Sequence, residues 1–130
     1  MIIVLLSMLF CHVVDDYYLQ GWLASAKQKK YWEENAPDDL YKHDYICALA
    51  THAFSWSFMI HVPIFICMAM GILRIPVLLF IFIFVVNCIV HAYVDNAKAN
   101  LFIINLVLDQ SIHWTQIIAT WLIYEACVLI

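Results

Sequence analysis

Three pairs of histidine and aspartate stand in stretches of sequence that are otherwise apolar. The two residues of each pair are four positions apart: His12 and Asp16, His91 and Asp95, Asp109 and His113. Positions four apart on an α-helix lie on the same face, one turn from each other. If the three stretches are helical, each one therefore presents an imidazole beside a carboxylate. Imidazole and carboxylate together suit zinc, iron or manganese.

Two further histidines occupy the remaining apolar segment. His52 and His61 are nine residues apart, which on a helix of 3.6 residues per turn places them about 180° from each other. Only one of the two histidines can therefore lie on the face that contacts the three pairs. We predict that His52 joins the three pairs and that His61 stays outside the group.

Composition indicates the environment of these side chains. Of the 130 residues, 66% are hydrophobic and 12% are charged, whereas a soluble domain carries about 25% charged residues. The net charge of −4, with only six Lys and Arg, gives no basic stripe and argues against a nucleic-acid partner. The five cysteines stand singly in apolar segments, as packed thiols rather than as a disulfide framework.

We predict an all-α, polytopic membrane protein with four transmembrane helices in one bundle. The whole chain, 1–130, forms a single transmembrane domain, because about 20 apolar residues are needed for each crossing. The first helix lacks a basic start and a small-residue cleavage site, so it is interpreted as a retained helix rather than a signal peptide. The expected helices are about 2–22, 45–70, 76–95 and 101–127, with a polar loop at 23–44.

The positive charges of the loops predict the orientation. Lys and Arg are concentrated before residue 45 and at Lys98, whereas the loop between the second and third helices has only Arg74. Loops rich in Lys and Arg remain in the cytoplasm, so both termini are expected outside it, with loop 23–44 inside. Each helix then carries a histidine roughly 8 to 18 Å from the cytoplasmic boundary, at 5.4 Å per helical turn.

Each of these residues also has an ordinary structural interpretation. A lone intramembrane histidine such as His52 commonly makes a hydrogen bond between helices. Asp16 and Asp95 could be carboxylates at the membrane interface, and Asp15 and Lys98 could be boundary charges. The repetition favours a functional site, because three pairs and His52 agree on one depth.

The order of the motifs resembles the signature of a family of small bacterial and phage membrane proteins, a domain of unknown function. The motifs are H-x3-D-x2-L-Q at 12–20, H-x3-D-x2-K at 91–98 and D-Q-x2-H at 109–113. The resemblance implies a four-helix membrane fold in a bacterial inner membrane and the same site positions, but no activity. The chain departs from that pattern by its second acid, Asp15, and by its polar first loop.

The predicted metal ligands come from all four helices: His12, Asp16, His52, His91, Asp95, Asp109 and His113. A transition metal, with zinc favoured over iron or manganese, could ionise a water molecule for attack on an ester or phosphoester. Asp16 and Asp95 would act as bases in that reaction, and Lys98 would contact a phosphate. At this depth the substrate would be a membrane lipid or a lipid-linked molecule.

Two other functions fit the same residues. A chain of His and Asp side chains can relay protons or pass a metal ion, as in transporters. A metal or ion-pair cluster could instead lock the helices of a non-enzymatic membrane interaction protein. The sequence leaves homo-oligomerisation open, together with the identity of the metal and of the substrate.

Overall fold

The computed structural model describes residues 2–128 and is built from helices, with no strand in that range. Four helices are long: α1 (Ile2–Val14), α4 (Asp44–Ala69), α5 (Val77–Ala99) and α6 (Leu106–Val128). A π-helical turn, η1 (Asp15–Leu19), extends α1. The all-helical class predicted from the sequence is confirmed.

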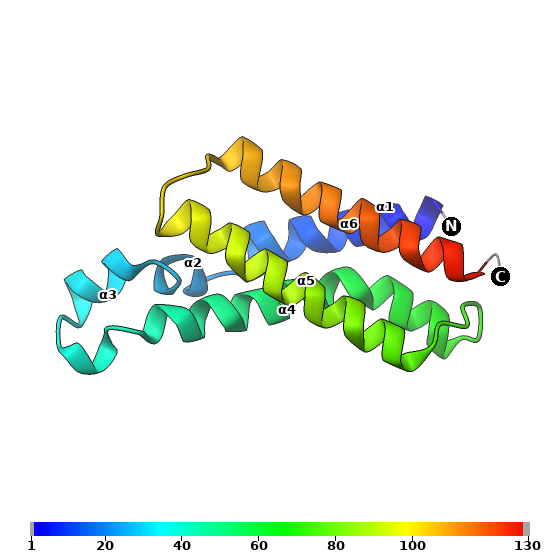
Figure 1. The fold of residues 1–130 in the computed structure, drawn as a ribbon, viewed down its shortest axis with the longest axis horizontal. Helices are drawn as coiled ribbons and strands as arrows, with labels where there is room; N and C mark the ends of the chain where they lie inside the picture. The colour runs from blue at the N-terminus through cyan, green and yellow to red at the C-terminus, as the bar shows by residue number, and fades with distance from the viewer. Residues whose placement is uncertain (1, 129–130) are drawn as a thin grey trace.

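The four long helices form one bundle in which each helix has two neighbours. Helix α4 packs against α1 and α5, and α6 packs against the same two helices from the opposite side. Figure 1 shows both termini at one end of the bundle, together with the turn that joins α4 to α5. The segment that contains α2 and α3, and the connection from α5 to α6, lie at the other end. We call these the terminal end and the loop end.

Residues 23–44 are more ordered than the polar loop expected there. They contain two short helices, α2 (Leu23–Ala26) and α3 (Lys29–Asn35), and the 3₁₀ turn η2 (Asp39–Tyr41). The indole N–H of Trp32 donates to the Ala26 carbonyl over 2.7 Å. Asn100, after α5, accepts from the Lys29 amide and donates to the Lys27 carbonyl. This segment is therefore tied to the end of α5.

The last helix starts five residues later than expected. Asn105 accepts a hydrogen bond from the Leu108 amide over 2.9 Å, which is the usual geometry of a residue that caps a helix start. The preceding stretch, 101–105, is not helical, and its Phe102 has a φ of 55°. An Asn cap and a left-handed backbone angle are both incompatible with a helix that begins at 101.

Three helical stretches are long and apolar enough to cross a membrane: Ile2–Leu19, Asp39–Ala69 and Val77–Ala99. Apolar side chains on their outer faces are exposed, for example Phe10 at 68%, Phe58 at 55% and Leu78 at 83%. Helix α6 is equally long, but Asp109, Gln110, His113 and Gln116 lower its mean hydropathy. The structure thus supports three candidate spans of the four that the sequence predicts.

The apolar core fills the terminal end of the bundle. It is formed by buried side chains from all four long helices and from the α4–α5 turn: Met8, Trp56, Ile60, Ile64, Leu73, Ile75, Ile83, Ile117 and Tyr124. The histidines and aspartates singled out by their spacing lie closer to the loop end. Burial of this core holds the helices together, so the polar groups above it need not do so.

Candidate metal centre

Eight ionisable side chains from the four long helices and η1 meet in one buried layer. The layer is made of His12, Asp15, Asp16, His52, His91, Asp95, Asp109 and His113. The side chain of Asp16 is 6% exposed, and those of the other seven are at most 2% exposed. We call this group the His/Asp layer. Charged groups at such burial need partners, because their desolvation is costly.

The π-helical turn η1 explains why two adjacent carboxylates of the first span both face inward. A π-helix has more residues per turn than an α-helix, so consecutive side chains are separated by a smaller angle. Asp15 accepts a hydrogen bond from the Ser55 hydroxyl over 2.6 Å. Asp16, the next residue, contacts His52, with 3.2 Å between its Oδ1 and the imidazole Nε2.

The Nε2 atom of His52 is surrounded by more polar groups than one proton can serve. It lies 3.2 Å from His91 Nε2, 3.2 Å from Asp16 Oδ1 and 3.4 Å from Asp95 Oδ2. The side-chain amide of Gln20 also points at it, over 3.0 Å. A neutral imidazole has one N–H and one acceptor nitrogen. One proton can therefore serve only one of these neighbours. The others remain with their lone pairs directed at each other, which is unfavourable without a cation between them.

His113 presents a second set of unsatisfied atoms. Its Nε2 lies 3.4 Å from Asp95 Oδ1 and 3.5 Å from Asp109 Oδ1. Neither ring nitrogen of His113, nor either of those oxygens, has a well-aligned hydrogen-bond partner among the described residues. Buried polar side-chain atoms are usually paired. Unpaired carboxylate oxygens and an unprotonated imidazole nitrogen at such distances offer lone pairs that a bound cation would satisfy.

Two lysines already neutralise part of the charge. The ammonium of Lys27 contacts Asp95 Oδ2, and that of Lys98 contacts Asp109 Oδ2 over 2.5 Å. Lys27 is only 5% exposed, and the hydrogen bonds of Asn100 described above hold its backbone beside α5. Four carboxylates and two ammonium groups leave two negative charges in the layer when the imidazoles are neutral. One divalent cation would balance them.

His12 lies in the layer, but both of its nitrogens have partners. The Trp56 indole donates to Nδ1 over 2.7 Å, so the proton of the neutral ring is on Nε2 and is donated to Gln110 Oε1 over 3.1 Å. The Gln110 amide then donates to Asp16 Oδ2 and to Asp109 Oδ2. Each hydrogen bond in this series is donated in the same direction, from Trp56 through His12 and Gln110 to the two carboxylates. His12 thus orients the two carboxylates and is not itself free to bind a metal.

Two groups in the layer could hold a metal ion: Asp16 with His52 and His91, and His91 with Asp95 and His113. Ligand atoms bound at ~2.0–2.1 Å to one tetrahedral zinc lie roughly 3.3–3.4 Å apart. The distances of 3.2 Å from His52 Nε2 to its neighbours in the first group are close to that spacing. The donor set of two imidazoles and one carboxylate also fits zinc.

Groups that could support the two imidazoles of the first group lie beside them. A ligating histidine usually gives its other ring N–H to a carboxylate or a carbonyl. Asp15 Oδ2 lies 3.7 Å from Nδ1 of His52, and Ser55 holds the other oxygen of Asp15. The ring of His91 is stacked on Trp56, with centroids 4.1 Å apart. Nδ1 of His91 has no hydrogen-bond partner among the described residues, so stacking on Trp56 is the contact that orients its ring.

Of the seven predicted ligands, the two groups contain Asp16, His52, His91, Asp95 and His113. The structure leaves out the other two. His12 is occupied by Trp56 and Gln110. Asp109 contacts Lys98 through Oδ2 and is in neither group, although its Oδ1 has no partner among the described residues and lies 3.5 Å from His113 Nε2. Lys98, predicted to be catalytic, contacts a carboxylate of the layer and is still 27% exposed at its side chain.

Sequence reasoning missed four residues that belong to the site: Asp15, Lys27, Trp56 and Gln110. Trp56 follows His52 by four positions, so helical spacing could have included it. Gln110 stands in the D-Q-x2-H motif next to Asp109, but spacing gave no reason to select it, because neighbours in sequence do not share a helical face. Asp15 was interpreted as a possible boundary charge near the end of the first helix. Lys27 lies in a segment that was expected to be a loop, and no spacing rule would have selected it.

His61 lies outside the layer, as expected from its opposite face. Its Nδ1 lies 2.7 Å from the Ser57 carbonyl, and its Nε2 lies 3.1 Å from the Tyr124 hydroxyl. Its ring is also in edge contact with Phe80. Each nitrogen has one partner of suitable polarity, so no cation is needed there.

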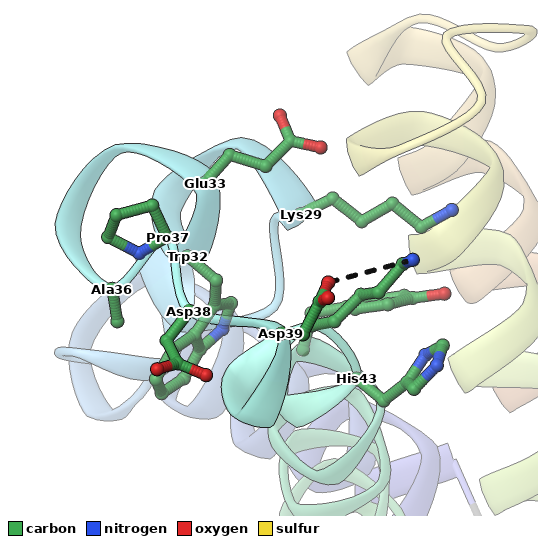
Figure 2. Close-up of a pocket in the computed structure, with 10 residues that line it drawn as sticks. Lys29, Trp32, Glu33, Ala36, Pro37, Asp38, Asp39 and His43 are labelled. Atoms are coloured by element: carbon green, nitrogen blue, oxygen red, sulfur yellow. Dashed lines mark ion pairs between the residues drawn. The ribbon is translucent and has the colours of Figure 1, made fainter.

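A separate surface pocket of about 310 Å³ lies on the segment of α3 and η2. Figure 2 shows its lining, which includes Trp32, Pro37 and Asp39 and the ion pair between Asp39 and Lys42. None of the lining residues belongs to the His/Asp layer. The pocket is therefore not an access route to the candidate metal centre.

Comparisons with known proteins add no name to this geometry. No family model, no curated protein and no solved structure matches the chain. The functional interpretation therefore depends on the site itself.

Proposed function

We propose that the protein is an integral membrane protein of four spans that binds a divalent transition metal, with zinc favoured, and hydrolyses a lipid-linked ester or phosphoester. The observation that carries the proposal is the convergence of Asp16, His52 and His91, with unsatisfied buried atoms beside them. Three protein ligands of this kind, two imidazoles and one carboxylate, are the composition of catalytic zinc sites that keep an open position. A structural zinc site has four protein ligands.

The proposal of a fourth span depends on the orientation of α6. Its polar residues Asp109 and His113 have no exposed surface, whereas Val107, Leu108 and Leu122 are 48% to 74% exposed. Polar groups in a membrane helix face the bundle interior, so a low mean hydropathy does not exclude a crossing. Its 23 residues exceed the ~20 needed to span. We further propose a bacterial inner membrane, with the loop end in the cytoplasm.

The reaction would use side chains in defined positions. A divalent ion at this site would ionise a water molecule near neutral pH. Asp95, which is not one of the three ligands and whose Oδ1 has no hydrogen-bond partner among the described residues, would accept the proton from water and return it to the departing alcohol. The water oxygen would form the new bond to phosphorus or to the carbonyl carbon, and the bond to the lipid alcohol would break. Lys98 would stabilise the developing negative charge on the oxygens of the reacting group.

The experiment is elemental analysis followed by an activity assay. Purified protein should contain near-stoichiometric transition metal, and chelation should abolish the hydrolysis of lipid phosphoesters and carboxylic esters in mixed micelles. Added zinc should restore it, and Asp95→Asn, which leaves the three ligands in place, should lower kcat. Metal-free protein as purified, with no ion bound on titration, would overturn the proposal. A bound metal with no hydrolysis of any lipid ester would favour a cluster that only holds the helices together.

Transport is the second candidate, and one observation favours it. Buried polar groups continue from the His/Asp layer towards the terminal end. Gln116 donates to Asn87, which donates to Thr120 over 2.9 Å, and His61 with Tyr124 lies beyond them. Proton or zinc uptake by proteoliposomes that His91→Ala abolishes would establish this function in place of hydrolysis.

A further inference from the structure

A second cavity, of about 320 Å³, opens beside the His/Asp layer at the loop end. Its inner wall carries ionisable groups, Asp16, Lys27 and Lys98, and its outer wall carries the apolar or aromatic side chains of Tyr17, Phe102 and Leu106. The cavity thus joins a charged floor to an apolar rim. Ligand sites of this kind are typically ~300–1,000 Å³, so this one has room for a headgroup rather than a whole lipid.

The rim is exposed on the outside of the bundle. Tyr17, Phe102 and Leu106 are 57%, 80% and 56% exposed, so they would contact acyl chains in a membrane. Phe102 has a φ of 55°, a strained conformation that is uncommon for an aromatic residue. Such conformations concentrate at ligand sites. Here it places a ring at the mouth of the cavity.

Lys98 supplies the N–H donors that remain available on the floor. An ammonium group has three N–H donors, and Lys98 gives one to Asp109 Oδ2. The side chain keeps 27% of its surface exposed, so its other donors can reach a ligand. Lys27 is nearly buried against Asp95 and adds charge behind the floor. Phosphate is a usual partner of such a lysine.

We propose that this cavity binds the phosphate of an anionic lipid, with Lys98 on the phosphate and the hydrocarbon leaving the bundle past Tyr17, Phe102 and Leu106. This inference deepens and rests on the proposed function, because it narrows the substrate to phosphate-bearing amphiphiles and places their access between α1 and α6. A lipid ester without a phosphate would contact the apolar rim but would have no group for Lys98 to bind.

The test is a binding measurement on the full chain in detergent with three probes. Dioctanoyl phosphatidate carries both features, dioctanoyl glycerol carries only the chains, and inorganic phosphate carries only the anion. We expect phosphatidate to bind at least tenfold more tightly than either of the others. Equal binding of phosphatidate and the glycerol, or of phosphatidate and inorganic phosphate, would overturn the inference.

Three variants assign that binding to the cavity. Lys98→Gln should reduce the preference for phosphatidate at least tenfold, while Lys30→Gln, an equal charge change on exposed α3, should not. Leu106→Trp fills the mouth at an exposed position, so it should weaken phosphatidate binding even if Lys98→Gln does not fold. Unchanged binding in Leu106→Trp would overturn the inference by itself.

Each measurement is made on chelated and on zinc-loaded protein, which separates the two proposals. Preference for phosphatidate in a protein that never binds metal would refute the proposed function and leave the lipid site standing. A zinc-dependent lipid esterase whose binding of phosphatidate and of the glycerol is equal would refute the lipid site alone.

Discussion

Helix α4 carries two buried histidines in opposite situations. His52 and His61 are 1% and 2% exposed, so burial does not distinguish them. His61 has one partner for each ring nitrogen, whereas Nε2 of His52 has four polar groups within 3.4 Å and only one proton to share. The comparison teaches that a metal site is indicated by unsatisfied convergence and not by burial. The predictions below would break or sharpen that contrast.

The largest difference is expected in metal content. His52→Ala should lower the affinity for zinc more than ~100-fold, beyond the effect of losing a group that only supports a ligand. His61→Ala removes an equally buried imidazole from the same helix and should leave metal content unchanged. Elemental analysis of both purified variants measures this, and equal metal in the two would erase the contrast between the histidines.

The next largest effect is expected on the free energy of unfolding, and it concerns the lysine that pairs with Asp95. Lys27→Ala leaves the Asp95 carboxylate buried without its ammonium partner, and we expect a loss of about 3–5 kcal/mol in unfolding free energy. Lys30→Ala breaks an exposed pair with Glu34 and should cost at most ~1 kcal/mol. Unfolding in detergent compares them. A mild effect of Lys27→Ala would mean that Asp95 is neutral or compensated within the bundle.

Asp15 tests whether His52 has the support of a ligating residue. Asp15→Asn removes the carboxylate behind His52 Nδ1 and should lower metal affinity by about 10- to 100-fold. Asp39→Asn, a change of the same kind in the exposed turn η2, is the control and should have no effect. Competition with a chelator of known affinity gives both values. If Asp15→Asn binds metal as tightly as the unmodified protein, His52 is oriented by other contacts.

The smallest effect belongs to the satisfied histidine. Tyr124→Phe removes the hydroxyl partner of His61 Nε2, and hydrogen bonds between membrane helices contribute about 0.6 and at most ~1.7 kcal/mol. Unfolding free energy should fall within that range while metal content stays the same. Loss of metal in this variant would show that the two halves of the bundle are coupled.

The spacing of His and Asp residues was enough to predict much of the fold and the site. The four-residue spacing predicted that Asp16, His91, Asp95 and His113 turn inward, because lipid cannot satisfy polar groups. The face opposite His61 predicted the same of His52, and the structure brings the five residues together. The same rule selected Asp109, which lies in the layer beside His113 but uses one of its two oxygens to bind Lys98. Spacing identifies a shared face but not the partner that occupies it.

Other features could not be predicted because they depend on contacts from elsewhere in the chain. Lys27 reaches Asp95 only because Asn100 holds its backbone at the end of α5. His12 is withdrawn from the ligand set by the indole of Trp56 on a different helix. The start of the last helix depends on the Asn105 cap, and hydrophobicity alone does not predict a cap.

The π-helical turn η1 makes the length of this segment matter as much as its composition. Such a turn holds one residue more than the α-helix that could replace it, so deleting Tyr18 would let the helix rewind without changing any carboxylate. Asp15 and Asp16 would then be splayed apart like neighbours on an ordinary helix. The variant without Tyr18 keeps every carboxylate of the His/Asp layer. It should nevertheless bind metal as poorly as a variant that lacks one of those carboxylates.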